Sequence, residues 1–189
     1  MGRMLSEAQQ KALAAYNWGP SNLEGHLDKY NGALNVSELP EETQNYIKRI
    51  NELVAKGETL DNAQITVESG GRPDVVSKAG AVGLTQILPT TATNPGFSSN
   101  QELTELSAQL SELSKSEVIE RLKNPEFNQR FGRAYREALF NKFSPEGSVI
   151  AAEVPIETAK VPTEIDEVST VTTAALPYQK LREERERLA

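Results

Sequence analysis

The sequence predicts a mainly α-helical protein with little or no β structure, and three observations lead to that fold class. Residues that favour helix starts recur along the chain, apolar residues repeat at helical spacing between them, and only residues 72–80 have strand or turn character. A chain of 189 residues is long enough for one domain with a core of its own. We therefore expect one folded domain over residues 1–145.

Helix starts are marked by side chains that accept hydrogen bonds from free backbone amides. Capping boxes are predicted at Ser6 with Gln9, Ser99 with Glu102, and Ser114 with Glu117. Asn124 before Pro125 has the pattern of an N-cap and a first helical residue. With the apolar periodicity, these signals predict helices over residues 6–16, 40–55, 60–69, 83–92, 100–112, 116–123 and 125–143.

The composition changes after Pro145. Residues 148–177 contain no aromatic residue and have Val, Thr and Ala without a steady period, which is typical of an extended linker. We predict a linker over residues 146–177 and a charged helix over residues 178–189. A segment without aromatic residues contributes little to a core, so the fold is expected to depend on residues 1–145.

Charge and residue usage exclude several classes of function. The formal net charge of −7 argues against nucleic acid as the main partner, because phosphate binding needs a basic face. The sequence has no cysteine, which excludes disulfides and thiolate metal sites, and His26 is the only histidine, so no metal site is expected. No apolar run has the length of a signal peptide or a membrane span.

Three motifs carry the chemical information. The first is Glu68-Ser69-Gly70, with Pro73 after it and then Gly83-Leu84-Thr85-Gln86-Ile87-Leu88-Pro89. The others are Ala15-Tyr16-Asn17-Trp18-Gly19-Pro20 and Leu39-Pro40-Glu41-Glu42-Thr43 with Tyr46. Together they resemble the signature of the soluble lytic transglycosylase family, which has the goose-type lysozyme fold.

That resemblance implies a substrate, a reaction and a set of site residues. The substrate would be the bond between N-acetylmuramic acid and N-acetylglucosamine in peptidoglycan, cleaved without water to a 1,6-anhydromuramic product. Glu68 would be the general acid and base, and no cofactor would be required. The residues implied to bind substrate are Ser69, Gln86, Tyr16, Asn17 and Tyr46.

The location of Glu68 fits such a role on physical grounds. The glycines at positions 70 and 71 predict that Glu68 lies near the C-terminal end of a helix, where the helix dipole disfavours a carboxylate. Partial burial would disfavour the charge further. Both effects would raise its pKa, as a general acid requires near neutral pH.

This chain departs from the family pattern in two respects. The Tyr16 and Tyr46 motifs precede the Glu68 motif, whereas in the family they follow the long helix, so we expect a circularly permuted domain whose former ends join near residues 54–61. Thr85 replaces a methionine, and we expect this change to tune the fit of substrate beside the cleft.

Two alternative functions remain at this stage. A hydrolytic lysozyme would use a second acid, for which Asp74 is the nearest candidate, although its position after Pro73 favours a turn. A non-catalytic wall-binding or structural virion protein is the other. Asn94-Pro95-Gly96-Phe97 and Asn124-Pro125-Glu126-Phe127 resemble versions in phage virion transglycosylases. We therefore expect a virion protein, or one delivered to the bacterial periplasm, whose tail binds a virion partner.

Overall fold

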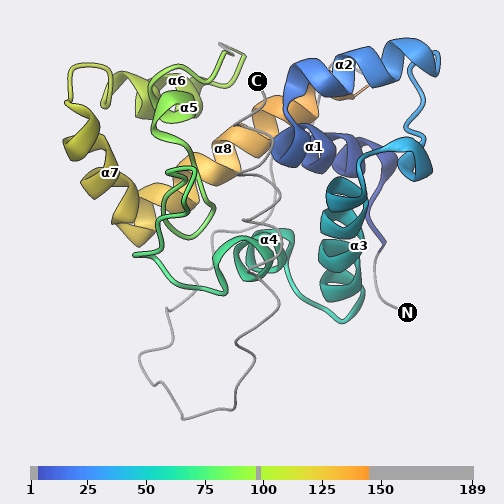
Figure 1. Ribbon diagram of the computed structural model, residues 1–189, viewed down its shortest axis with the longest axis horizontal. Coiled ribbons are helices and arrows are strands. Elements are labelled where there is room, and N and C mark those ends of the chain that lie inside the picture. The colour runs from blue at the N-terminus through green and yellow to red at the C-terminus, as the bar shows by residue number, and fades with distance from the viewer. Residues whose placement is uncertain (1–3, 97–98, 145–189) are drawn as a thin grey trace.

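The computed structural model describes residues 4–96 and 99–144 (Figure 1). In chain order its helices are α1 (Glu7–Trp18), α2 (Pro20–Lys29), the 3₁₀ helix η1 (Val36–Glu38), α3 (Glu41–Ala55), α4 (Leu60–Ser69), α5 (Pro89–Thr93), α6 (Gln101–Ala108), α7 (Lys115–Lys123) and α8 (Pro125–Phe143). Val82 forms isolated bridges with Val76 and Ile87, and no strand occurs among the described residues. The predicted mainly α fold is therefore confirmed.

Helix α8 runs through the centre of the domain. Figure 1 shows α1, α2 and α3 at one end of α8, α5, α6 and α7 at the other, and α4 between the two groups. α1, α6 and α7 pack directly on α8, and α3 packs on both α1 and α4. Phe131, Ala134, Ala138 and Leu139 of α8 are fully buried in the shared core. The apolar period of residues 125–143 thus produces the helix around which the other elements pack.

Most predicted helix starts are confirmed. Ser6 and Ser114 each form a complete capping box, with Gln9 and Glu117 respectively. The Asn124 side chain caps α8 by accepting from the Phe127 N–H at 2.9 Å. Each cap satisfies an amide that the helix itself cannot bond.

One cap prediction was wrong by a residue. The N-cap of α6 is Asn100, whose Oδ1 accepts from the Leu103 N–H at 2.9 Å, and not Ser99. Asn and Ser are equally good caps, so the local sequence does not decide between neighbours. Because the helix starts one residue later, Glu102 takes no part in a capping box and instead pairs with Arg130 of α8 at 3.0 Å.

Other predictions need correction in extent. The helix expected over residues 83–92 is only α5, because Gly83 and Gln86 have φ of 79° and 50°, which interrupt a right-handed helix. The sequence did not predict α2, whose apolar spacing is weak, although its Leu23 and His26 are buried. The predicted linker and C-terminal helix, residues 146–177 and 178–189, lie outside the described residues. No described helix is long and apolar enough to cross a membrane.

Candidate active site around Glu68

Helix α4 carries Glu68 in its last turn, as the sequence predicts. The helix begins at Thr59, whose Oγ1 accepts from the Asn62 N–H at 3.2 Å. It ends at Gly70, which adopts the left-handed conformation with φ of 64°, a conformation that glycine reaches at little cost. Glu68 is half-buried at this end. Glu68 therefore lies near the negative end of the helix dipole, in a residue that is partly exposed.

Tyr46 is the direct partner of the Glu68 carboxyl. Its hydroxyl donates to Glu68 Oε1 at 2.7 Å, and its side chain is only 1% exposed. Burial, and then the Glu68 carboxylate beside it, raise the pKa of Tyr46 well above its usual value. Tyr46 therefore keeps its proton and acts as a hydrogen-bond donor to Glu68. Two of the predicted site residues, one from α3 and one from α4, are brought together by this bond.

Ser69 adjoins Glu68 but faces the protein interior. It is fully buried, and its Oγ donates to the Ile65 carbonyl at 3.2 Å within α4. This bond closes the last turn of α4 from inside. The geometry thus gives Ser69 a role in holding the end of the helix that carries Glu68, and sugar binding by Ser69 stays a prediction.

Tyr16 and Asn17 connect α1 to the rest of the site. The Tyr16 hydroxyl donates to the Thr85 carbonyl at 2.9 Å, and its ring packs edge-on against Tyr135 of α8 with centroids 5.4 Å apart. Asn17 Oδ1 accepts from Thr43 Oγ1 at 2.8 Å, which joins α1 to α3. Tyr16 thus joins α1 to the turn that contains Thr85, and Asn17 joins α1 to α3, the helix that carries Tyr46.

The turn over residues 83–86 is held by Gln86. This side chain is 2% exposed, and its Nε2 donates to the Gly83 carbonyl at 2.9 Å and to the Val75 carbonyl at 3.3 Å. Gly83 has no room for a side chain, since a Cβ there would lie 2.5 Å from the Leu122 carbonyl oxygen. Gln86 thus fixes the turn, and its contact with a sugar stays a prediction.

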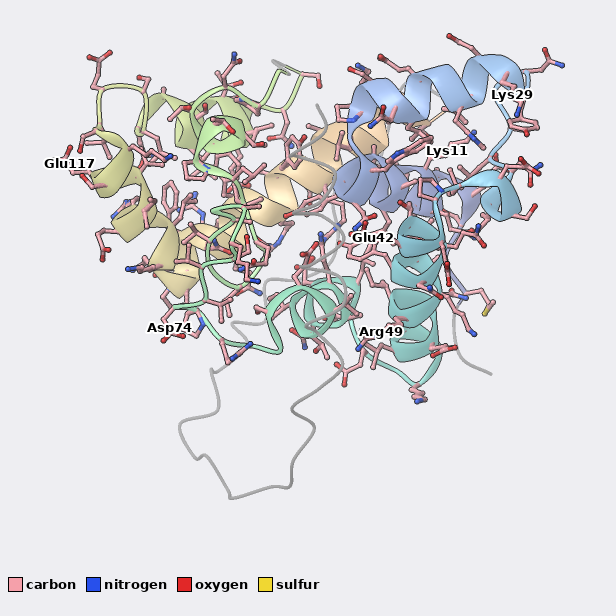
Figure 2. The ribbon with its side chains drawn as sticks, in the orientation of Figure 1. Lys11, Lys29, Glu42, Arg49, Asp74 and Glu117 are labelled. Carbon is pink, nitrogen blue, oxygen red and sulfur yellow. The ribbon has the colours of Figure 1, made fainter. Side chains whose placement is uncertain are left out.

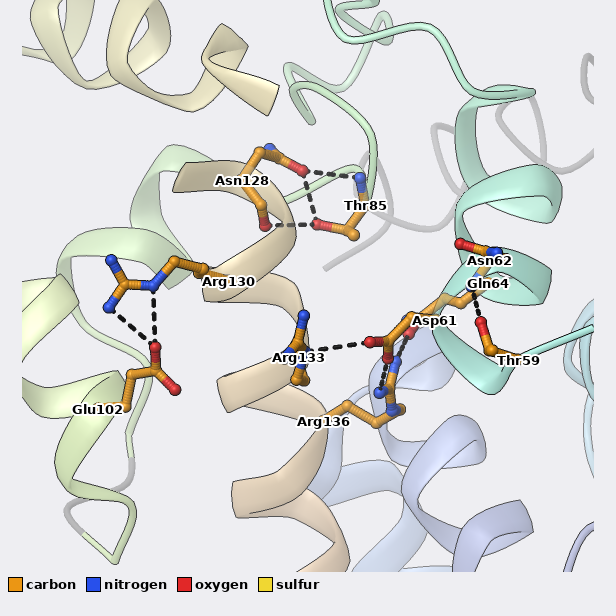
Figure 3. Close-up of polar contacts among 10 residues, drawn as sticks. All are labelled: Thr59, Asp61, Asn62, Gln64, Thr85, Glu102, Asn128, Arg130, Arg133 and Arg136. Atoms are coloured by element: carbon orange, nitrogen blue, oxygen red, sulfur yellow. Dashed lines mark hydrogen bonds and ion pairs between the residues drawn. The ribbon is translucent and has the colours of Figure 1, made fainter. Parts of the chain in front are cut away.

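Thr85 packs against α8, and its predicted effect on the fit of substrate stays a prediction. It is 3% exposed, and its N–H and Oγ1 both donate to Asn128 Oδ1 at 2.8 Å (Figure 3). A Cβ on Gly132 of α8 would lie 2.4 Å from Thr85 Oγ1. The compact threonine is therefore matched to a close approach between the turn and α8, where a longer side chain would not fit.

Some polar residues of the site were missed from the sequence. Gln64 is fully buried one turn before Glu68, and its Nε2 donates to the Tyr46 hydroxyl at 3.2 Å. Arg136 of α8 is 8% exposed and donates to Gln64. The signal for Gln64 was its spacing, because residues four apart on a helix share a face. Arg136 could have been singled out because it is a charged residue next to the apolar positions Tyr135 and Ala138, which face the core.

Two further residues are Trp18, which belongs to the Tyr16 motif, and Asp74, the alternative second acid. Trp18 packs edge-on against the His26 ring, with centroids 6.1 Å apart. Asp74 is exposed in a turn at the edge of the molecule (Figure 2). Across residues 4–96 and 99–144, no group of three or more His, Asp or Glu side chains is arranged to hold a metal ion.

The chain is similar to known proteins over the part that contains Glu68. The model of the transglycosylase SLT domain family matches residues 58–152, which is half of the chain. The chain belongs to this family. Glu68, Ser69 and Gln86 lie within the matched range, while Tyr16, Asn17 and Tyr46 precede it.

Two curated proteins also match. Both are named endo-type membrane-bound lytic murein transglycosylase A, from Klebsiella pneumoniae subsp. pneumoniae strain ATCC 700721 / MGH 78578 and from Klebsiella pneumoniae strain 342. Each is 44% identical over 82 residues, which cover 43% of this chain and 35% of the relative. The SLT chain thus spans about a third of the length of the curated relatives it matches. No solved structure gives a significant match.

Proposed function

We propose that this SLT-family chain is a peptidoglycan lytic transglycosylase and that Glu68 is its general acid and base. The observation that carries the proposal is the 2.7 Å hydrogen bond from the buried Tyr46 hydroxyl to the half-buried Glu68 carboxyl. It joins two sequence motifs at one accessible acid, inside the segment that matches the family. The name of the Klebsiella relatives supports the same substrate, the murein glycan.

The proposed reaction uses one carboxyl group twice. Glu68 gives its proton to the oxygen that links N-acetylmuramic acid to N-acetylglucosamine, as the bond from C1 to that oxygen breaks. The resulting carboxylate takes the proton of the muramic 6-hydroxyl, whose oxygen bonds to C1. The product has a 1,6-anhydro end, no water is consumed, and Glu68 is again protonated. The Tyr46 hydroxyl stabilises the carboxylate between the two transfers.

The test is product analysis with a Glu68 variant. Purified peptidoglycan is incubated with wild type, with Glu68→Gln, and with Glu52→Gln as a control on an exposed helix position. Wild type and the control are expected to release muropeptides with 1,6-anhydromuramic ends, lighter by one water than hydrolytic products. Glu68→Gln cannot cycle a proton, so its rate is expected to fall by about 10²-fold or more.

Three other results would each change the proposed function. Reducing muramic ends from wild type would make the enzyme a hydrolytic lysozyme. Binding without release of muropeptides would make the chain a wall-binding protein. Full activity of Glu68→Gln would remove Glu68 from the mechanism.

We also propose that the domain is circularly permuted relative to the family pattern. In support, the family match begins at residue 58, close to Gly57, and the motifs that precede it contact the matched segment through Tyr16 and Tyr46. Helix α1, from the beginning of the chain, packs against α8, the last described helix.

The permutation has a direct test. A chain re-cut between Gly57 and Glu58, with residues 144 and 5 joined by a short Gly/Ser linker, is expected to fold and to retain activity. The control has the same linker but opens within α8, and it should not fold cooperatively. Failure of the re-cut chain to fold would contradict the proposal.

A further inference from the structure

A buried row of polar groups leads to the Tyr46 hydroxyl, which also contacts Glu68. Gln64 is fully buried, lies one turn before Glu68 on the same face of α4, and donates from Nε2 to the Tyr46 hydroxyl at 3.2 Å. Its Oε1 accepts from Nη1 of Arg136 (Figure 3). A continuous series of hydrogen bonds therefore runs from α8 through α4 and α3 to the Glu68 carboxyl.

The guanidinium at the start of this row is fixed in place. Arg136 Nη2 pairs with Asp61 Oδ1, so the two ends of its fork are held by different side chains of α4. Arg133, one turn earlier on α8, has its Nε 3.0 Å from Asp61 Oδ2, with the N–H not aligned for a hydrogen bond. Asp61 thus balances charge on α8, and Arg136 remains oriented toward Gln64.

Arginine determines the direction of every bond in the row. A guanidinium has donors only, so the Gln64 carbonyl must face Arg136 and its amide NH₂ must face Tyr46. The Tyr46 oxygen then accepts from Gln64, and its single proton is left for Glu68 Oε1. Burial, and then Glu68, raise the pKa of Tyr46 well above its usual value, so Tyr46 keeps this proton at neutral pH.

We propose that Gln64 and Arg136 are positioning residues that direct the Tyr46 proton to Glu68 Oε1. This inference rests on the proposed role of Glu68. Neither Gln64 nor Arg136 contacts the substrate in this scheme, since Gln64 is fully buried and Arg136 nearly so. Their effect on the reaction passes through Tyr46.

The decisive variant is Gln64→Glu. It preserves the size of the side chain and keeps an acceptor for Arg136, so the fold is expected to survive. A carboxylate at position 64 cannot donate to Tyr46, however, and instead competes with Glu68 for the Tyr46 proton. Loss of one hydrogen bond to a charged group corresponds to a fall in kcat of about 10- to 100-fold, with KM within about threefold of wild type.

Three further variants distinguish this positioning role from an effect of added charge on α4 and from an effect independent of Tyr46. Asn62→Asp places the same added charge on α4 at an exposed position outside the row, and its kcat should be unchanged. Gln64→Met removes the donor without adding charge and should lower kcat as Gln64→Glu does. Combining Gln64→Met with Tyr46→Phe should cost no more than the larger single loss, because both changes remove the same directed proton.

The measurements are initial rates on soluble glycan strands over a concentration series, with urea unfolding of each variant and Glu68→Gln assayed in parallel. Folded Gln64 variants with wild-type kcat, while Glu68→Gln is inactive, would overturn this inference alone. Multiplying losses in the double variant would also overturn it, since they would show Gln64 and Tyr46 acting independently. Full activity of Glu68→Gln would overturn the proposed function and this inference with it.

Discussion

Replacing Asn128 by leucine tests how the turn over residues 83–86 is held against α8. Asn128 is fully buried and uses its whole carboxamide: Oδ1 accepts from the Thr85 N–H and Oγ1 at 2.8 Å, and Nδ2 donates to the Val82 and Leu122 carbonyls at 2.9 Å. Leucine has a similar shape but no polar atoms. The change therefore removes these bonds without opening a large cavity.

The expected loss of stability depends on which buried groups lose their last hydrogen-bond partner. The Val82 carbonyl still accepts from the Ile87 N–H at 3.1 Å, and Thr85 Oγ1 still donates to the backbone carbonyl of residue 128 at 3.2 Å. Two buried backbone groups, the Thr85 N–H and the Leu122 carbonyl, are left unsatisfied. At about 1–3 kcal/mol each, the expected loss in the free energy of unfolding is about 2–6 kcal/mol. The melting temperature should fall by roughly 6 °C or more.

The assay is urea and thermal unfolding followed by circular dichroism at the helix band. Asn141→Leu is the matched control, because Asn141 is an exposed asparagine on the same helix, and it should stay within about 0.5 kcal/mol of wild type. If Asn128→Leu unfolds within the range of this control, the buried amide does not hold the turn and the reasoning is refuted.

Two other predictions concern packing and protonation. Gly132→Ala puts a Cβ 2.4 Å from Thr85 Oγ1 and should lower the free energy of unfolding by about 1–3 kcal/mol, whereas Gly25→Ala meets nothing within 4 Å and should raise it slightly; equal urea midpoints would contradict this. His26 is the single histidine, and burial, followed by the charge of Lys29, lowers its pKa below the usual 6.5. An NMR titration of His26 should therefore give a pKa below 6.5. A measured pKa at or above 6.5 would contradict the burial argument. Since the folded-state pKa is depressed, stability from neutral His26 is complete above about pH 6.5 and is lost as the pH falls through the folded-state pKa.

The sequence predicted those features that depend on neighbouring residues. The caps at Ser6, Ser114 and Asn124 act within three residues, so their patterns located the helices correctly. The end of α4 at Gly70, and hence the setting of Glu68, was predictable for the same reason.

Features that depend on distant residues were not predictable in this way. The turn at Gly83 and Gln86 was interpreted as helix because its apolar spacing allows one. Its backbone is fixed instead by Leu122 and Asn128, some 40 positions away. The Gln64 side chain, by itself, has the pattern of an ordinary polar position on a helix. Its hydrogen bonds depend on Arg136, which lies 72 positions later in the sequence.

The central position of α8 has a consequence for the order in which activity appears during synthesis. The turn over residues 83–86 needs Asn128 for its hydrogen bonds, and the Gln64 carbonyl needs Arg136, so both depend on α8. A nascent chain that ends before residue 136 lacks the contact from Arg136 to Gln64, so in the proposed scheme Tyr46 would not yet be oriented toward Glu68. Contacts between residues 69 to 75 positions apart also slow the final step relative to a simple helical bundle. On the proposed function, activity would appear only when α8, the last described helix, has docked.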